Sequence, residues 1–152
     1  MKIKKFSITA LASVLMLTGC ATNHSSPLYS YLNASTSTTV EQVRLSDLYG
    51  EQWTEFALVC PYTTKDEVKE ELGIKINTYL TDSTDDSSND IVLRDKDGSY
   101  DWIYFNRFDI VYLCNGSAEN LKIYPIDSVL EFEHRDDYGT WKLSAITEPG
   151  NQ

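Results

Sequence analysis

The chain has 152 residues, of which 41% are hydrophobic, and its 23 acidic residues outweigh 13 basic ones to give a net charge of −10. This length provides one ordinary domain, and the acidic balance argues against a nucleic-acid partner, because phosphate binding requires a basic surface. Aromatic residues make up 12% of the chain, which is more than expected of a sequence that stays disordered.

The N-terminus has the pattern of an export signal. Lysines within residues 2–5 precede an apolar run over residues 6–17, which is too short for a permanent transmembrane helix but suits a signal peptide. The run ends in Leu17-Thr18-Gly19-Cys20, which resembles the lipobox of bacterial lipoproteins. The resemblance implies cleavage before Cys20 and a diacylglyceryl group on its thiol, so that two acyl chains anchor the protein in a membrane of the cell envelope. An ordinary secretory signal, or a cytosolic protein with an apolar start, are the alternatives.

This signal divides the chain into four parts. We expect a signal peptide over residues 1–19, a lipidated flexible tether over 20–39, a single domain over 40–148 and a tail over 149–152. Ser, Thr and Asn dominate the tether, as is typical of linkers, although Tyr29 and Leu32 are large enough to dock on the domain instead. Cleavage removes three lysines and no acid, so the mature chain has ten basic and 23 acidic residues and a charge of −13.

Helical signals lie in the first half of the domain. Apolar residues spaced through 39–50 predict a short helix, and the apolar run 53–61 predicts a buried strand. Thr64 and Glu67 form a capping box that predicts a second helix, and Gly73 supplies its end. An acidic loop is expected next, over residues 81–90.

The second half of the domain has the pattern of an antiparallel β-meander. Turn dipeptides at Asp97-Gly98 and Asn115-Gly116 separate short runs of alternating apolar and polar residues. The fold class is therefore α+β, with about five or six strands and one packed helix. The expected strands cover residues 91–94, 100–105, 108–114, 121–126, 129–135 and 141–146.

Two cysteines remain once Cys20 is assigned to the lipid. An even number of cysteines in an exported protein favours a disulfide, here between Cys60 and Cys114. Such a bridge would close a loop of roughly 54 residues and stabilise the fold by about 4 kcal/mol. A metal site is the alternative, but zinc would require further ligands such as histidine, and a redox pair would require Cys-x-x-Cys spacing.

The sequence gives little indication of catalysis. His134 follows Glu131 and Glu133 at a predicted strand end, where an acid could orient the imidazole as a general base, but a solvated strand end is the simpler explanation. The same acids, with Asp136, could pair for glycoside hydrolysis, but nothing fixes their separation. Because no nucleophile, phosphate-loop or dinucleotide motif is present, we expect a protein that is not an enzyme and carries no cofactor.

A calcium site is a second possibility for the acidic residues. Asp95, Asp97 and Asp101 lie around the Asp97-Gly98 turn, and further acids lie upstream in the 82–90 region. Calcium needs six to eight oxygens around one point, and the EF-hand spacing is absent. The alternative is a polar hairpin turn beside a solvated acidic loop.

Aromatic residues give the most specific candidate for binding. Trp102 and Tyr104 share one face of a predicted strand, and Tyr112 and Trp141 lie on neighbouring strands. Tyr and Trp are enriched at protein interfaces, although filling the core of a small domain is the simpler explanation of these rings.

These features together predict a membrane-anchored envelope lipoprotein that binds another protein without catalysis. A strongly acidic surface would steer a basic partner toward it, and salt would weaken the attraction. Tethered inhibitors of lysozyme and immunity proteins against secreted toxins have a similar general plan, which makes an inhibitor, immunity or accessory role the leading hypothesis. A lipoprotein that binds a small ligand or calcium is the alternative.

Overall fold

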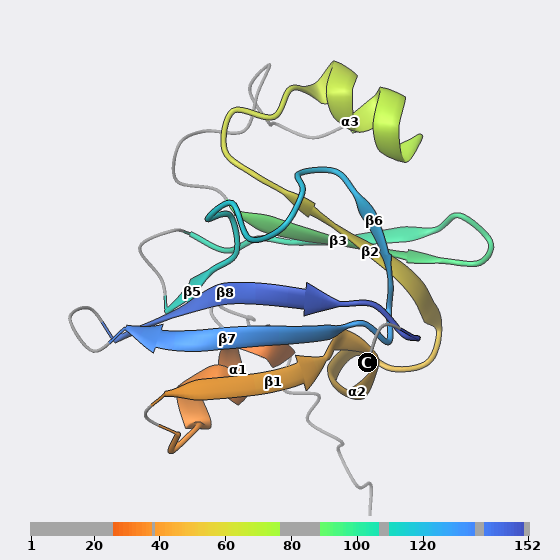
Figure 1. Cartoon of the computed structure of the whole chain (residues 1–152). Helices are drawn as coiled ribbons and strands as arrows, with labels where there is room; N and C mark the ends of the chain where they lie inside the picture. Colours follow the sequence, from red (N-terminus) through yellow and green to blue (C-terminus); the bar gives the residue numbers. More distant parts are fainter. Residues whose placement is uncertain (1–25, 38, 77–88, 107–109, 136–138, 151–152) are drawn as a thin grey trace, which may run out of the picture.

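Two sheets form the framework of the molecule. The computed structural model describes residues 26–37, 39–76, 89–106, 110–135 and 139–150, and these contain two four-stranded sheets and three short helices (Figure 1). The first sheet has the strand order β1-β7-β8-β5, and the second has the order β4-β3-β2-β6. The first sheet consists of β1 (Val40–Arg44), β7 (Val129–Arg135), β8 (Thr140–Thr147) and β5 (Val111–Tyr112). The second consists of β4 (Tyr100–Ile103), β3 (Asp90–Asp95), β2 (Trp53–Val59) and β6 (Ile123–Pro125).

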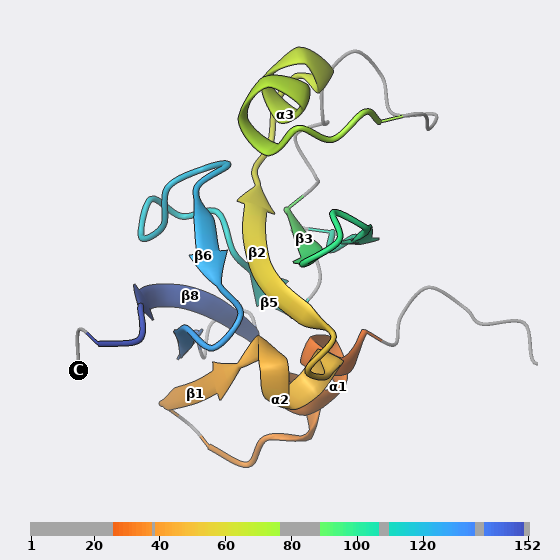
Figure 2. The ribbon, with the colours of Figure 1, turned by 90° about the vertical axis from the view of Figure 1, so that its right-hand side faces the viewer.

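The α+β class is confirmed, but the single meander with one helix is wrong in detail. Most strand pairs are antiparallel, whereas β5 runs parallel to β8. The chain therefore leaves the second sheet after β4 and enters the first at β5. Figure 2 shows the two layers from the side, with α3 beyond the second sheet.

The main core lies between the two sheets. Phe56 and Leu93 from the second sheet and Phe132 and Leu143 from the first belong to one cluster, and each is at most 1% exposed. These residues come from strands with alternating or continuous apolar runs, so the hydrophobic pattern alone directs them inward.

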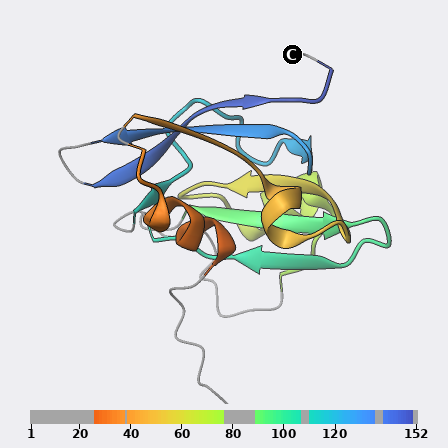
Figure 3. The same ribbon diagram turned by 90° about the horizontal axis from the view of Figure 1, so that it is seen from below.

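The segment expected as a tether contains a helix. Helix α1 (Pro27–Ala34) begins after Ser26, whose side chain accepts a hydrogen bond from the Tyr29 amide, and it closes one side of the core (Figure 3). Leu28 and Leu32 are 0% and 1% exposed. The prediction of a flexible tether is therefore wrong for residues 27–34. A helix this short is marginal in isolation, but these two leucines, one turn apart, stabilise it by burying one of its faces in the core. The predicted lipid site at Cys20 lies outside the described residues.

The expected helix over residues 39–50 is half wrong. Strand β1 comes first, and only the second part forms a helix, α2 (Leu45–Tyr49), which ends at Gly50 with a φ of 93°. Val43 lies opposite Leu130 of β7 in the sheet. This pairing, with a strand that lies 87 residues later in the chain, overrides a local spacing that fits a helix as well as a strand.

The predicted capping box is confirmed. Helix α3 (Lys65–Leu72) begins after Thr64, whose hydroxyl accepts from the Glu67 amide while the Glu67 carboxylate accepts from the Thr64 amide, and Gly73 ends the helix with a left-handed φ of 69°. The inward face of α3 packs on the second sheet over a smaller apolar cluster. The second sheet is therefore covered on both faces, by the first sheet and by α3.

A disulfide joins the ends of strands in different sheets. Cys60 follows β2, Cys114 follows β5, and their sulfurs are bonded with the Cα atoms 5.5 Å apart. Among the described helices, none is long and apolar enough to cross a membrane.

Candidate functional site

An aromatic row lies along the edge strand β4 and ends at Tyr104, the residue that follows the strand. Tyr100, Trp102 and Tyr104 point to the same side of the strand, because alternate residues of a strand share a face. Tyr100 is 43% and Tyr104 53% exposed, while Trp102 is half-buried and its ring lies 6.0 Å from that of Tyr104. The β3–β4 hairpin, drawn in green, forms one border of the second sheet in Figure 3. The row therefore presents rings along the border of the sheet.

A buried carboxylate fixes the orientation of Trp102. Asp90 is 0% exposed, and its Oδ2 atom accepts a hydrogen bond of 3.0 Å from the indole Nε1 of Trp102. Its Oδ1 atom accepts from the backbone amide of Phe105 at 3.2 Å. Asp90 was expected in a solvated acidic loop, which is wrong for this residue, since it is the first residue of β3. The remaining acids of the expected loop, over 81–88, lie outside the described residues.

The side chain of the neighbouring Asn89 forms hydrogen bonds with the backbone that follows the aromatic row. Its side-chain Nδ2 donates to the carbonyl of Phe105 at 3.1 Å, and its side-chain Oδ1 accepts from the backbone amide of Leu113. Since Asn89 is also fully buried, these bonds form in a low-dielectric setting where polar networks rigidify the structure. The aromatic row is therefore built on a fixed support.

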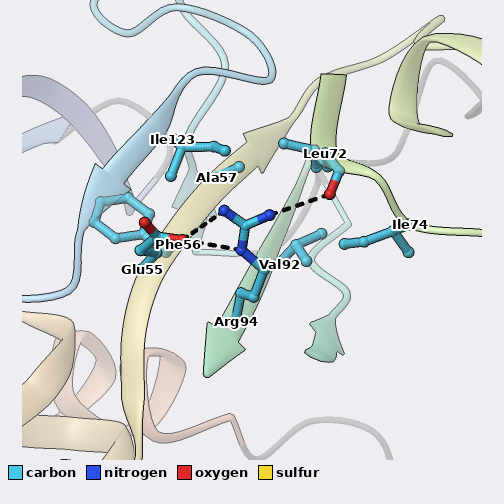
Figure 4. A pocket seen from close by; sticks show the side chains of 8 residues that line it. All are labelled: Glu55, Phe56, Ala57, Leu72, Ile74, Val92, Arg94 and Ile123. Atoms are coloured by element: carbon cyan, nitrogen blue, oxygen red, sulfur yellow. Dashed lines mark hydrogen bonds and ion pairs between the residues drawn. The ribbon is translucent and has the colours of Figure 1, made fainter. Parts of the chain in front are cut away.

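A small apolar pocket lies beneath α3, close to the row. Figure 4 shows the Arg94 guanidinium at its rim, donating from Nε to Glu55 Oε2 at 2.9 Å and from Nη1 to the carbonyl of Leu72 at 3.2 Å. The cavity measures only about 10 Å³, which is room for no more than one water molecule. The Glu55–Arg94 pair thus connects β2, β3 and the end of α3, and the pocket is too small for an organic ligand.

Two wider hollows flank helix α2. One of about 490 Å³ is lined by the carboxylates of Asp47, Glu51 and Asp127 together with Trp53. The other, of about 250 Å³, shares Asp47 and includes Tyr31. The first hollow is acidic, whereas in the second Arg44 lies beside Asp47 and balances its charge.

The four aromatic candidates from the sequence do not form one surface. Trp102 and Tyr104 come together, but Trp141 is only 3% exposed and belongs to the main core, so its prediction as a binding residue is wrong. It lies inward because Trp141 and Leu143 alternate with polar residues on β8. Tyr112 is half-buried on β5, in the other sheet. The missed member of the site is Tyr100, and its alternation with Trp102 and Tyr104 is the signal that identifies it.

The calcium candidates have a local structural role. Asp95 Oδ1 accepts hydrogen bonds from the amides of Asp97 and Ser99, at 2.8 and 2.9 Å, and so stabilises the predicted hairpin turn. Asp101 lies on β4 and is exposed. Over the described part of the chain, no three His, Cys, Asp or Glu side chains gather where they could hold one metal ion. The imidazole of His134 packs on Trp141 with ring centroids 4.8 Å apart.

Comparison of this chain with protein families, with characterised proteins and with solved structures found no match.

Proposed function

We propose that this protein is a membrane-anchored lipoprotein of a bacterial cell envelope that binds another protein without catalysis, in an inhibitor, immunity or accessory role. The observation that carries the proposal is the aromatic row along β4, in which Trp102 is oriented by its hydrogen bond to Asp90. Tyr and Trp supply large contact areas at a low cost in side-chain entropy and are the residues that dominate binding at interfaces. The acidic surface adds long-range attraction for a basic partner.

The anchoring part of the proposal depends on Cys20. We expect cells fed a radioactive or clickable fatty acid to label the full chain and to retain it in the membrane fraction. A Cys20→Ala variant should lose both the label and the membrane retention. Equal labelling of the two proteins would contradict lipidation at this cysteine.

The binding part is tested by photo-crosslinking inside the cells that make the protein. A photoreactive phenylalanine analogue replaces Tyr104 in one variant and Tyr62 in a control, because Tyr62 is a still more exposed tyrosine, at 69%, in the connection between β2 and α3. We expect a discrete crosslinked protein from position 104 and none from position 62. Absence of a crosslink at 104, or the same products from both positions, would contradict a protein-binding role for the row.

A further inference from the structure

We infer that the partner presents an extended, basic segment that pairs with β4 as an additional strand and places Lys or Arg side chains on the rings of Tyr100, Trp102 and Tyr104. This inference rests on the proposed function and specifies the chemistry of the partner. It combines three features of the described residues: the free backbone of an edge strand, the aromatic face beside it and the local excess of acids.

The backbone of β4 has hydrogen-bonding groups that face away from β3. The Asp95 amide donates to the carbonyl of Ser99, and the Asn89 amide donates to that of Phe105. In an antiparallel ladder the bonded pairs alternate with non-bonded ones, so this register turns the N–H and C=O groups of Tyr100 and Trp102 outward. No other strand of the described chain pairs with β4 on that side.

The other sheet edges are less suited to strand addition. Strands β5 and β6 have two and three residues, which is short for a stable ladder. At the β1 edge, the hydroxyl of Ser37 already donates to the carbonyl of Val40, and Glu41 accepts hydrogen bonds from Tyr31 and Ser35. Strand β4 is the border of the framework that combines an open backbone with large exposed side chains.

The charges around β4 select a basic segment. Between residues 89 and 106, Asp90 is fully buried, but three further aspartates (Asp95, Asp97 and Asp101) lie outside the core, and of the two basic residues Arg94 is already paired with Glu55. Side chains at alternate positions of an added strand share the face that bears the aromatic row. Lys or Arg at those positions would meet ring faces, where cations are attracted by the π-system.

Strand addition is a known mode of peptide recognition in which the backbone supplies affinity and alternate side chains supply specificity. The arrangement on β4 has both parts: outward amides at Tyr100 and Trp102, and a ring at every second position. A membrane surface would use the rings alone and would leave the two outward amides exposed to water.

Amide hydrogen exchange, followed by NMR on the full chain in a non-ionic detergent, tests the inference directly. The probe is a ten-residue peptide of alternating Lys and Val, long enough to span β4. At a peptide concentration about ten times its Kd, we expect exchange at the amides of Tyr100 and Trp102 to slow about tenfold, because only the unbound fraction exchanges. The amide of Tyr62 should be unaffected.

Two control peptides separate strand addition from simple charge attraction. A peptide of the same sequence, N-methylated at alternate residues on its pairing edge, should give no protection, and a Glu-Val peptide should not bind. In the protein, the double variant Tyr100→Ser/Tyr104→Ser should weaken binding of the Lys-Val peptide about tenfold, since two cation–π contacts are lost, whereas Tyr62→Ser should have no effect.

The inference is overturned if the Lys-Val peptide leaves the two β4 amides unprotected, if the N-methylated peptide protects them equally, or if only lipid vesicles perturb the aromatic row. A crosslinked partner at position 104 combined with unprotected amides would overturn strand addition alone and leave the proposed function intact.

Discussion

The indole Nε1 of Trp141 donates a hydrogen bond of 3.0 Å to the backbone carbonyl of Leu32, 109 residues earlier in the chain. This bond attaches α1 to β8, and Leu32 itself is buried in the main core. The segment ahead of the first strand is therefore part of the folded unit, and its loss would open one side of the core.

Truncation of Leu32 tests the contribution of α1. We expect Leu32→Ala to lower the free energy of unfolding by about 2–5 kcal/mol, because it removes a fully buried side chain and leaves a cavity. Urea denaturation followed by circular dichroism measures the change. The neighbouring exposed residue provides the control, since Asn33→Ala should change stability by no more than about 0.5 kcal/mol. Equal stability of the two variants would show that α1 is not docked.

Substitution of Asp90 tests the support beneath Trp102. An Asp90→Asn side chain has the same shape but only one accepting oxygen, so it cannot satisfy both the indole and the Phe105 amide. We expect a loss of about 1–3 kcal/mol and a clear shift of the Trp102 indole N–H resonance in NMR spectra. Asp97→Asn, on the exposed hairpin turn, serves as the matched control. An unmoved indole resonance would argue against the fixed orientation of the ring.

Removal of the disulfide tests the connection between the sheets. The sequence separation of 54 residues predicts a loss of about 4 kcal/mol in the chain-entropy model. The double variant Cys60→Ala/Cys114→Ala and the reduced wild type should both show this loss in urea denaturation. If the oxidised and reduced proteins unfold at the same urea concentration, the bridge contributes nothing to stability.

Alkaline pH should destabilise the protein through Tyr49. Burial raises the pKa of the Tyr49 phenol above its ordinary value of 10.0, although the hydrogen bond from the Leu28 amide opposes the shift. Because the folded state holds this proton more tightly than the unfolded state, the phenol's contribution is complete below the unfolded pKa. It is lost as pH rises through the folded pKa.

The measurement is the dependence of unfolding free energy on pH between about 9 and 11.5, a window around the tyrosine pKa. The unfolding free energy of the wild type should fall more steeply with pH than that of Tyr49→Phe. The comparison uses the slopes, so a pH-independent difference in stability between the two proteins does not affect it. Tyr31, whose pKa is also raised by burial and by its hydrogen bond to Glu41, is present in both proteins and cancels. Parallel profiles would contradict the prediction.

Local signals predicted the elements that local interactions stabilise. The capping box of Thr64 and Glu67 fixed the start of α3, and the alternation along residues 129–135 predicted β7 with the bounds that the structure has. The Asp97-Gly98 dipeptide likewise marked the β3–β4 turn. In each case the residues that determine the structure are close together in the sequence.

Elements stabilised by distant contacts were predicted poorly. Val43 can serve a helix or a strand, and its pairing with Leu130 decides the outcome. Helix α1 depends on the core that Leu28 and Leu32 enter. The aromatic site shows the same division, because alternation placed Trp102 and Tyr104 on one face, whereas the burial of Trp141 depends on how the two sheets stack.

Because α1 begins early in the chain, the segment that would link the lipid at Cys20 to the folded unit is short. Only five residues lie between Cys20 and Ser26, the cap of the helix, and the six Cα–Cα steps from one to the other span about 20 Å when the chain is fully extended. With lipid on Cys20, the folded unit would stay within a thin layer above the bilayer and could not search the wider envelope. A partner would then have to come to the membrane surface, and two anchored proteins confined to that layer would meet at a much higher local concentration than free ones.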